Sequence, residues 1–388
     1  MTTKSSELRK PLYEISMYDP QTNTQAFLVV DSLQNGVAGG GIRMTPQVSL
    51  DEVRRLARSM TYKLSAVKVT AGGAKAGIVG DPRSPHKKAH LKAFAKMMEP
   101  FLKSFYVAGE DMGTSAEDVA FVYDVINFSW VRLASLKAKK YGIKLQIPND
   151  FDPSAVGGEN LELILTGYGV AESTEEACNF LGIEPKGARV VIQGFGTVGS
   201  MTANFLGQKG FNIVAVADIE HTIYSPQGLD VEKLVAATDS FGNVDPGRLD
   251  FEHQILHRDQ WIGLEADILI PAAVPDTINS ANVGQVKARL IVEAANIPVT
   301  EAAEKYLFEK GIAVVPDFIA SAGSAGGLGL VLTGQVPLDP MKILSEIGRR
   351  LKQTTHKVLS ISKADGIQPR EAAVRLAEEF LVDSNPFA

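Results

Sequence analysis

Two short segments of this sequence carry residue types that can do chemistry. In residues 69–78 (VTAGGAKAGI), Lys75 is surrounded by glycine and alanine. An amine without bulky neighbours can approach a bound substrate closely, and burial favours its neutral form, which can act as a base. In residues 190–199 (VVIQGFGTVG), an apolar run leads into the pattern G-x-G-x-x-G. Because this pattern is typical of dinucleotide-binding turns, the two segments together indicate nicotinamide-dependent redox chemistry at a carbon that bears nitrogen.

The glycine-rich segment has the surroundings that a dinucleotide-binding turn requires. Residues 189–193 read as a strand, and the pattern after Gly199 is helical. In such a turn the first glycine allows the sharp bend, the second lets the backbone approach the pyrophosphate, and the third allows the helix to pack on the strand. The amino end of the helix adds a positive field for the phosphates. The expected cofactor contacts are Gly194, Phe195, Gly196, Thr197, Val198 and Gly199.

Asp218 is expected to end the next strand, nineteen residues after Gly199. A carboxylate at this point can accept hydrogen bonds from the ribose hydroxyls of the adenosine. It would also repel a 2′-phosphate, so the sequence favours NAD, with NADP as the alternative cofactor. A second interpretation is that Asp218 only ends the strand as a turn residue.

The glycine-rich turn belongs to a region in which strands and helices alternate. This region begins near Thr166, and such alternation is typical of a doubly wound parallel sheet. Its predicted strands are 189–193, 212–218, 268–271, 290–293 and 313–316.

The region that carries Lys75 is expected to form a separate α/β domain. Glu14 to Val30 read as short strands, and Ser49 is expected to cap a helix with apolar residues at helical spacing. We therefore predict a two-domain α/β fold. Residues 1–150 form a substrate domain, which helices in 340–388 complete by folding back onto it. Residues 160–335 form a doubly wound Rossmann dinucleotide-binding domain.

The composition limits the classes of protein to which this chain can belong. The 388 residues are 45% hydrophobic and 22% charged, with a net charge of −6, which argues against nucleic acid as a partner. No apolar run approaches the length of a membrane span, and the first ten residues lack the apolar core of a signal peptide. The single cysteine, Cys178, excludes an internal disulfide, and no metal-binding spacing is present. We expect a cytoplasmic protein without a metal site.

The segment around Lys75 is one of several motifs that resemble the glutamate/leucine/phenylalanine/valine dehydrogenase family of amino-acid dehydrogenases. The resemblance covers most of the chain, and the motifs follow the order of the family. They are residues 40–43 (GGIR), 60–63 (MTYK), 72–75 (GGAK), 110–114 (EDMGT), 166–170 (TGYGV), 267–273 (DILIPAA), 293–296 (EAAN) and 316–317 (PD). This resemblance implies NAD(P)-dependent oxidative deamination of an L-amino acid to the 2-oxo acid and ammonia, and the reverse reductive amination.

The same resemblance implies roles for individual residues. Lys75 would be the base that activates water, Asp111 the proton shuttle, and Lys63 the cation that binds the α-carboxylate. Taken alone, Lys63 reads as a solvated helix lysine and Asp111 as a turn or cap residue. Further substrate contacts would be Gly39, Gly40, Met60 and Ser321, and further cofactor contacts Thr166, Ala272, Ala273 and Asn296. Relatives in this family form homo-oligomers, so we expect one here.

Gly39 bears on which amino acid is the substrate. Family members that act on glutamate resemble one another in having a lysine just before the Gly-Gly-hydrophobic-Arg run, where it pairs with the side-chain carboxylate. Gly39 stands there in this chain, and a buried carboxylate without a partner is costly. Branched-chain enzymes have a leucine, so a glycine leaves more room. We therefore expect an apolar or aromatic side chain, with glutamate as the alternative.

The segment 319–327 (IASAGSAGG) departs from the family pattern, which has an asparagine in place of Ser321 followed directly by two glycines. By resemblance this segment lines the nicotinamide and the substrate side chain. The departure leaves substrate choice and the level of activity open. Lys68 is also an extra lysine relative to the family, and we interpret it as a surface charge.

Specific residues give little support to other functions. A 2-hydroxy-acid oxidoreductase needs a histidine base, but none of the six histidines has a glycine-flanked or carboxylate-paired context. A hydrolase is suggested only by Ser324, which reads as a loop residue. The remaining alternative is an NAD-binding regulatory protein of the same fold with little turnover, against which the presence of Lys63, Lys75 and Asp111 together argues.

Overall fold

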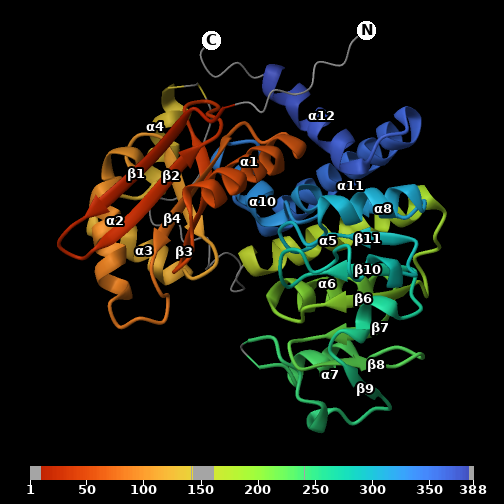
Figure 1. Ribbon diagram of the computed structural model, residues 1–388. Coiled ribbons are helices and arrows are strands. Elements are labelled where there is room, and N and C mark those ends of the chain that lie inside the picture. The colour runs from red at the N-terminus through yellow and green to blue at the C-terminus, as the bar shows by residue number, and fades with distance from the viewer. Residues whose placement is uncertain (1–9, 141, 143–160, 240, 384–388) are drawn as a thin grey trace. The chain divides into compact units, whose positions relative to one another are not determined.

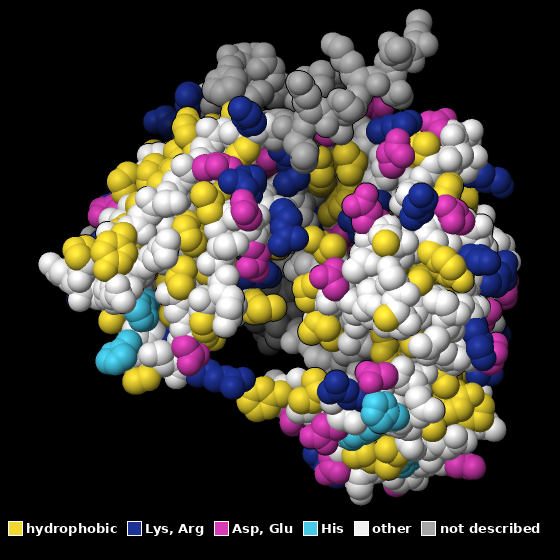
Figure 2. Space-filling model, in the orientation of Figure 1, with side chains coloured by type: hydrophobic (Ala, Val, Ile, Leu, Met, Phe, Trp, Pro, Cys, Tyr) yellow, Lys and Arg dark blue, Asp and Glu magenta, His cyan; other side chains and the backbone are white. Residues whose placement is uncertain are grey.

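The computed structural model describes residues 10–140, 142, 161–239 and 241–383 (Figure 1). The chain divides into two compact units. The first comprises Met1–Ser154, Leu328–Asp339 and Glu378–Ala388, and the second comprises Ala155–Gly327 and Pro340–Ala377. The domain boundary expected between residues 150 and 160 lies outside the described residues. Acidic and basic side chains are interspersed on the visible face of each unit (Figure 2).

The first unit contains a five-stranded sheet in the order β1-β2-β4-β3-β5. Its strands are β1 (Tyr13–Asp19), β2 (Thr24–Val30), β3 (Ala38–Thr45), β4 (Gly72–Val79) and β5 (Tyr106–Glu110), and its first helices are α1 (Leu50–Ala66), α2 (Lys87–Leu102), α3 (Ala116–Val125) and α4 (Trp130–Lys140). β3 runs parallel to β4 and β5, whereas β2 is antiparallel to β1 and β4. The glycine-rich segments around Gly40 and Lys75 are therefore neighbouring strands.

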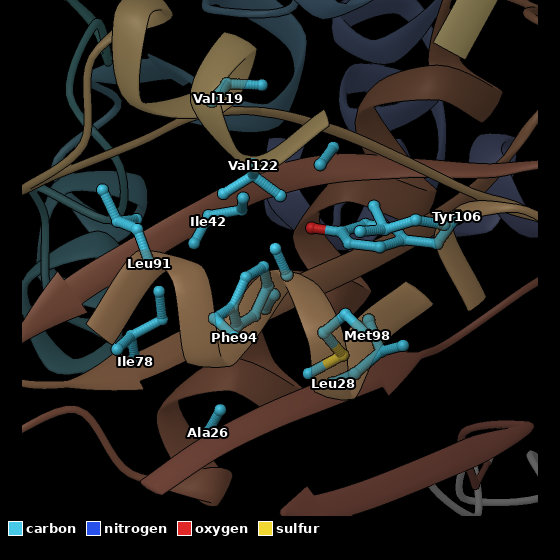
Figure 3. Close-up of a cluster of buried hydrophobic side chains, with 14 of the residues drawn as sticks. Ala26, Leu28, Ile42, Ile78, Leu91, Phe94, Met98, Tyr106, Val119 and Val122 are labelled. Carbon is cyan, nitrogen blue, oxygen red and sulfur yellow. The ribbon is translucent and has the colours of Figure 1, made fainter. Parts of the chain in front are cut away.

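The two faces of this sheet bury different sets of side chains, because successive residues of a strand point to opposite sides. One face packs against α2 and α3 in a core that includes Leu28, Ile42, Phe94 and Tyr106 (Figure 3). The other face is covered by α1. Ser49 caps α1, as predicted, and its side chain accepts a hydrogen bond from Glu52 N.

Glycines allow α1 to lie directly on the second face. A Cβ atom at Gly73 would lie 2.1 Å from Thr61 N, and one at Gly77 would lie 2.7 Å from Val53 Cγ2. Both contacts are shorter than side chains tolerate, so glycine at these two positions is required by the close approach of the helix. Lys75 lies between them on the same strand face.

The second unit contains a seven-stranded sheet in the order β12-β11-β10-β6-β7-β8-β9. Its strands are β6 (Arg189–Gln193), β7 (Asn212–Ala217), β8 (His221–Tyr224), β9 (Gln254–His257), β10 (Ile268–Pro271), β11 (Leu290–Val292) and β12 (Ala313–Val315). The strands from β12 to β7 are parallel, and β8 and β9 are antiparallel additions. The chain order reverses between β6 and β10, so this is a doubly wound sheet, which confirms the predicted fold class.

Helices complete the second unit and connect it to the first. They are α5 (Leu161–Leu181), α6 (Thr197–Gln208), α7 (Val231–Ala236), α8 (Glu301–Glu309), α9 (Asp317–Ala320), α10 (Gly323–Leu332), α11 (Pro340–Asp365) and α12 (Pro369–Asp383), with 3₁₀ turns at Pro246–Arg248, Gln260–Gly263 and Val283–Gln285. Among the described residues no single helix has the length and apolar composition to cross a membrane, although α3 with the start of α4 passes as a bent pair on those two criteria.

The position of the C-terminal helices corrects the expectation that residues 340–388 complete the first domain. Residues 340–377 belong to the second unit, because α11 lies along α5. Lys352 Nζ pairs with Glu172 at 3.0 Å and with Glu175 at 2.5 Å, and a Cβ at Gly348 would touch the ring of Tyr168. The chain returns to the first unit only at 328–339 and after residue 377.

Replacing Gly73 with alanine is expected to destabilise the protein, because the new Cβ would meet the backbone of Thr61 and push α1 away from β4. Overpacking of this kind costs about 1–3 kcal/mol, so the midpoint of urea unfolding should fall. Gly39→Ala is the matched control, since a Cβ there meets only Val107 O at 3.9 Å. Equal midpoints for the two variants would contradict the close packing of α1.

Candidate active site

Lys75 is the centre of the candidate site in the first unit. It lies on β4 with only 6% of its surface exposed. The strand residue opposite it on β2 is Val29, and α1 covers the same face. A long charged side chain is rarely buried to this extent without a partner.

That partner is Asp111, in the turn that follows β5. Lys75 Nζ lies 3.2 Å from Asp111 Oδ2. A Cβ at Gly41 would lie 2.9 Å from Asp111 Cβ, so the glycine of β3 makes room for this turn. Thr114 anchors the turn, because its Oγ1 accepts from Asp111 N at 3.1 Å and donates to Ile42 O at 2.7 Å. Lys75 and Asp111, to which the family resemblance gave roles in one reaction, are therefore in direct contact.

Arg43 and Glu52 extend this group, although no sequence pattern indicated a role for either of them. Arg43 Nε lies 2.7 Å from Asp111 Oδ2, and Arg43 Nη1 lies 2.7 Å from Glu52 Oε1. The Arg43 side chain is 9% exposed. The position of Arg43 in the GGIR motif, next to the predicted substrate residues, could have indicated a role in the site. Its contact with Asp111 could not be predicted, because the two residues are far apart in the sequence.

The environment shifts the pKa values of the central pair in a consistent way. Burial lowers the pKa of the Lys75 amine, and Arg43 lowers it further, which outweighs the opposite effect of Asp111. Burial alone would raise the pKa of the Asp111 carboxyl, but Lys75 and Arg43 together lower it to about 2. The site thus holds an amine that loses its proton more readily than an exposed lysine, beside a carboxylate that stays ionised.

The other predicted substrate residues are distributed over both units. Met60 and Lys63 lie three residues apart on α1, on one face of the helix, and Lys63 belongs to its last turn. Gly39 is on the strand face of Lys75, whereas Gly40 points to the opposite face, where a Cβ would lie 1.7 Å from Ala74 O. Ser321 belongs to the second unit and is buried, with Oγ donating to Asp317 O at 2.7 Å.

The glycine-rich turn of the second unit has the geometry that a dinucleotide needs. Gly194 has a φ of +91°, and a Cβ there would lie 2.7 Å from Ala273 Cβ. A Cβ at Gly199 would lie 1.9 Å from Gly194 O, so this glycine allows α6 to pack on the turn. Gly196 begins α6 without a side-chain cap, and a Cβ there would meet nothing within 4 Å. Backbone N–H groups at such a helix start suit a pyrophosphate.

This turn lies at the point where the strand order reverses, between β6 and β10, which is where such sheets bind ligands. Ala272 and Ala273 follow β10 directly, and Ala272 N donates to Gln193 O at 2.6 Å. Thr166, on α5, belongs to the same unit. The backbone of this turn would accommodate NAD(P), and Gly196, Thr197 and Val198 are the residues that would hold its phosphates. The backbone of Gly242 also approaches Gly196 closely.

Asp218, the predicted ribose contact, accepts three hydrogen bonds from backbone N–H groups of its own unit. Its Oδ1 accepts hydrogen bonds from Glu220 N and His221 N at 2.8 and 2.9 Å, and its Oδ2 accepts from Val244 N at 2.9 Å. The side chain is 3% exposed. The carboxylate thus holds together its own turn and a neighbouring loop, which is the turn interpretation, and it supplies no argument for NAD over NADP.

The turn that carries Asn296 rests on a buried group of charges. Ile297, with a φ of +49°, donates its N–H to Asp317 Oδ2 at 3.2 Å. Arg370 of α12 binds Asp317 at 2.8 Å and Glu293 at 2.5 Å. Burial raises the pKa of Glu293, and the nearby Asp317 carboxylate adds to this, although Arg370 opposes it. This network fixes the end of the sheet from which Asn296 projects, and local sequence patterns did not reveal it.

Comparison with known proteins agrees with this geometry. Residues 157–385 match the family described as glutamate/leucine/phenylalanine/valine dehydrogenase, and residues 13–128 match its dimerisation domain. This chain belongs to that family. The two matches together cover most of the sequence. The motifs around Lys75 and Gly194 both lie within them, as the resemblance implied.

Curated family members with related sequences are named glutamate dehydrogenases. The NADP-specific enzyme of Saccharolobus shibatae is 37% identical over 74% of this chain and 66% of its own length. The enzyme of Thermotoga maritima is 33% identical over 76% of this chain and 69% of its own length. The NAD-specific enzyme of Staphylococcus aureus is 34% identical over 74% and 67%. The match therefore spans about two thirds of these relatives.

Solved structures share the fold. The hetero-hexameric glutamate dehydrogenase of Thermus thermophilus, in a leucine-bound form, has a TM-score of 0.78 and is 27% identical, covering 97% of this chain and 89% of that one. The L-tryptophan dehydrogenase of Nostoc punctiforme has a TM-score of 0.68 and is 20% identical, covering 96% of each chain. At 20% identity, the second comparison shows a shared fold and supports no statement about function.

Replacing Asp218 with alanine is expected to lower stability without changing cofactor choice. Three backbone N–H groups would lose their acceptor, at a cost of about 1–3 kcal/mol for each that stays buried. Thermal unfolding and the affinities for NADH and NADPH check this. An unchanged melting temperature together with a large gain in NADPH affinity would support the ribose role instead.

Proposed function

We propose that this protein is an NAD(P)-dependent L-amino-acid dehydrogenase, which converts an L-amino acid to the 2-oxo acid and ammonia and catalyses the reverse reaction. The observation that carries the proposal is the contact between buried Lys75 and ionised Asp111. Membership of the dehydrogenase family and the names of its relatives support the same reaction.

In the proposed mechanism each group acts at one atom of the substrate. Lys63 binds the α-carboxylate, as the family resemblance implies. NAD(P), when bound, supplies the hydride acceptor. Once the hydride has left the α-carbon, Lys75 in its neutral form removes a proton from the water that attacks the resulting iminium carbon, and Asp111 passes a proton to the nitrogen, which leaves as ammonia. The lowered pKa of Lys75 supports this role, because a base must be unprotonated at the working pH.

The cofactor-binding part of the proposal rests on the second unit. Gly194, Gly196 and Gly199 fit the pyrophosphate, and relatives include enzymes named NAD-specific and NADP-specific. Because the Asp218 carboxylate is occupied, we propose NAD(P) without a stated preference. The match to a dimerisation domain supports a homo-oligomer, and light scattering of the purified protein tests it.

The substrate side chain is a finer proposal. The relatives are named glutamate dehydrogenases, which supports glutamate and goes against the apolar side chain expected from the sequence. We therefore propose glutamate as the substrate. The second candidate, an apolar amino acid, is favoured by one observation: Gly39 offers no cation, and a Cβ there would have room, with Val107 O at 3.9 Å.

The reaction is tested by following reduced nicotinamide over the common L-amino acids with NAD and with NADP. Lys75→Ala is expected to lower kcat by about 10²–10⁴-fold, the usual value of a positioned base. Lys68→Asn is the matched control, because Lys68 is exposed and its φ of +56° suits asparagine. No turnover of any amino acid by the unaltered protein, with NADH still bound, would favour the regulatory alternative.

Gly39→Lys tests the substrate proposal. A cation on the strand face of Lys75 should pair with a γ-carboxylate, and a charged hydrogen bond contributes about 1.5–3 kcal/mol. The ratio of kcat/KM for glutamate over leucine is therefore expected to rise by about 10–100-fold. Gly39→Met has a similar length without the charge and should not raise the ratio. If both variants change the ratio equally, residue 39 does not face the substrate side chain.

A further inference from the structure

Arg43 holds two carboxylates with one guanidinium. Its Nε binds Asp111 at 2.7 Å and its Nη1 binds Glu52 at 2.7 Å, so the planar group is fixed from both sides. It projects from β3 on the same face as Lys75, because Arg43 pairs with Gly77, two residues along β4. Asp111 lies between the two cations, because its Oδ2 contacts both Arg43 Nε and Lys75 Nζ.

We propose that Arg43 is a positioning residue for the dehydrogenase reaction: it holds the Asp111 carboxylate against the Lys75 amine, its positive charge favours loss of a proton from that amine, and Glu52 limits this effect. The inference deepens the proposed function and rests on it for its kinetic consequences. Asp111 and Glu52 both favour a proton on Lys75, since each is negative. The positive charge of Arg43 offsets them.

The charged groups that face Lys75 come from three elements, within the part of the chain described. β3 contributes Arg43, the turn after β5 contributes Asp111, and the first turn of α1 contributes Glu52. On β2 the residue opposite is the apolar Val29. α1 also carries Lys63, in its last turn. Arg43 is thus the cation with a direct bond to the carboxylate that contacts the amine.

Because of this arrangement, two substitutions are expected to shift the pH at which Lys75 loses its proton in opposite directions. In Arg43→Gln the amine loses a repelling charge, so Lys75 keeps its proton to higher pH. In Glu52→Gln it loses an attracting charge, so Lys75 releases its proton at lower pH. Arg43→Lys keeps the charge and loses the fork, and it should restore the pH dependence while kcat stays reduced. A purely structural role for Arg43 would lower activity equally at every pH.

The kinetic experiment measures kcat/KM against pH for the whole protein and these three variants. The acidic limb is expected to move up by about one pH unit in Arg43→Gln and down in Glu52→Gln. Limbs that stay within experimental error in both variants overturn the proposal. Because Arg43 is buried and its replacement could prevent folding, Glu52→Gln decides alone in that case. The Glu52 side chain is 29% exposed.

A second experiment separates this inference from the proposed function, because it needs no turnover. Trace labelling with acetic anhydride at a series of pH values, read for the Lys75 peptide by mass spectrometry, reports how readily that amine loses its proton. Opposite shifts in Arg43→Gln and Glu52→Gln support the inference even if no amino acid is oxidised. Unchanged labelling alongside normal turnover rejects the inference and leaves the proposed function intact.

Discussion

The direct packing of α1 on the glycine face of β4 is the constraint on which the candidate site depends. Gly73 and Gly77 let the helix backbone reach the sheet, and Lys75 is enclosed between them. An enclosed amine is disfavoured as a cation, and this effect of burial is the largest on its pKa. Larger residues at either position would lift the helix and return Lys75 to water. The chemistry proposed for Lys75 is therefore a consequence of the backbone distance between two elements.

The second unit would hold phosphates through backbone N–H groups, without charged side chains. The reversal of strand order between β6 and β10 opens space at the carboxyl ends of these strands, and Gly194 and Gly199 bring the start of α6 into it. Buried charges stabilise the surrounding turns. Asp218 binds three backbone N–H groups, and Arg370 ties α12 to the end of the sheet.

Predictions that depended on neighbouring residues were confirmed. The strand before Gly194 has the predicted bounds, Arg189–Gln193, and Ser49 caps α1. Glycine-rich β3 and β4 were noted as motifs but were not predicted as strands, because their sequences have few of the β-branched residues that mark strands. The prediction that α11 belongs to the first domain was wrong, because the sequence of a helix does not show which domain its apolar face will pack against.

The sequence by itself determined the family and the doubly wound sheet, and it selected Lys75 and Asp111 as candidates for one site. Local backbone preferences and short motifs encode these features. They can therefore be predicted without knowing which residues are neighbours in space. Only the tertiary structure decided that Arg43 binds Asp111, which is 68 residues away, and that the Asp218 carboxylate is already occupied. Strand register and the approach of one element to another set such contacts, and no local pattern contains them.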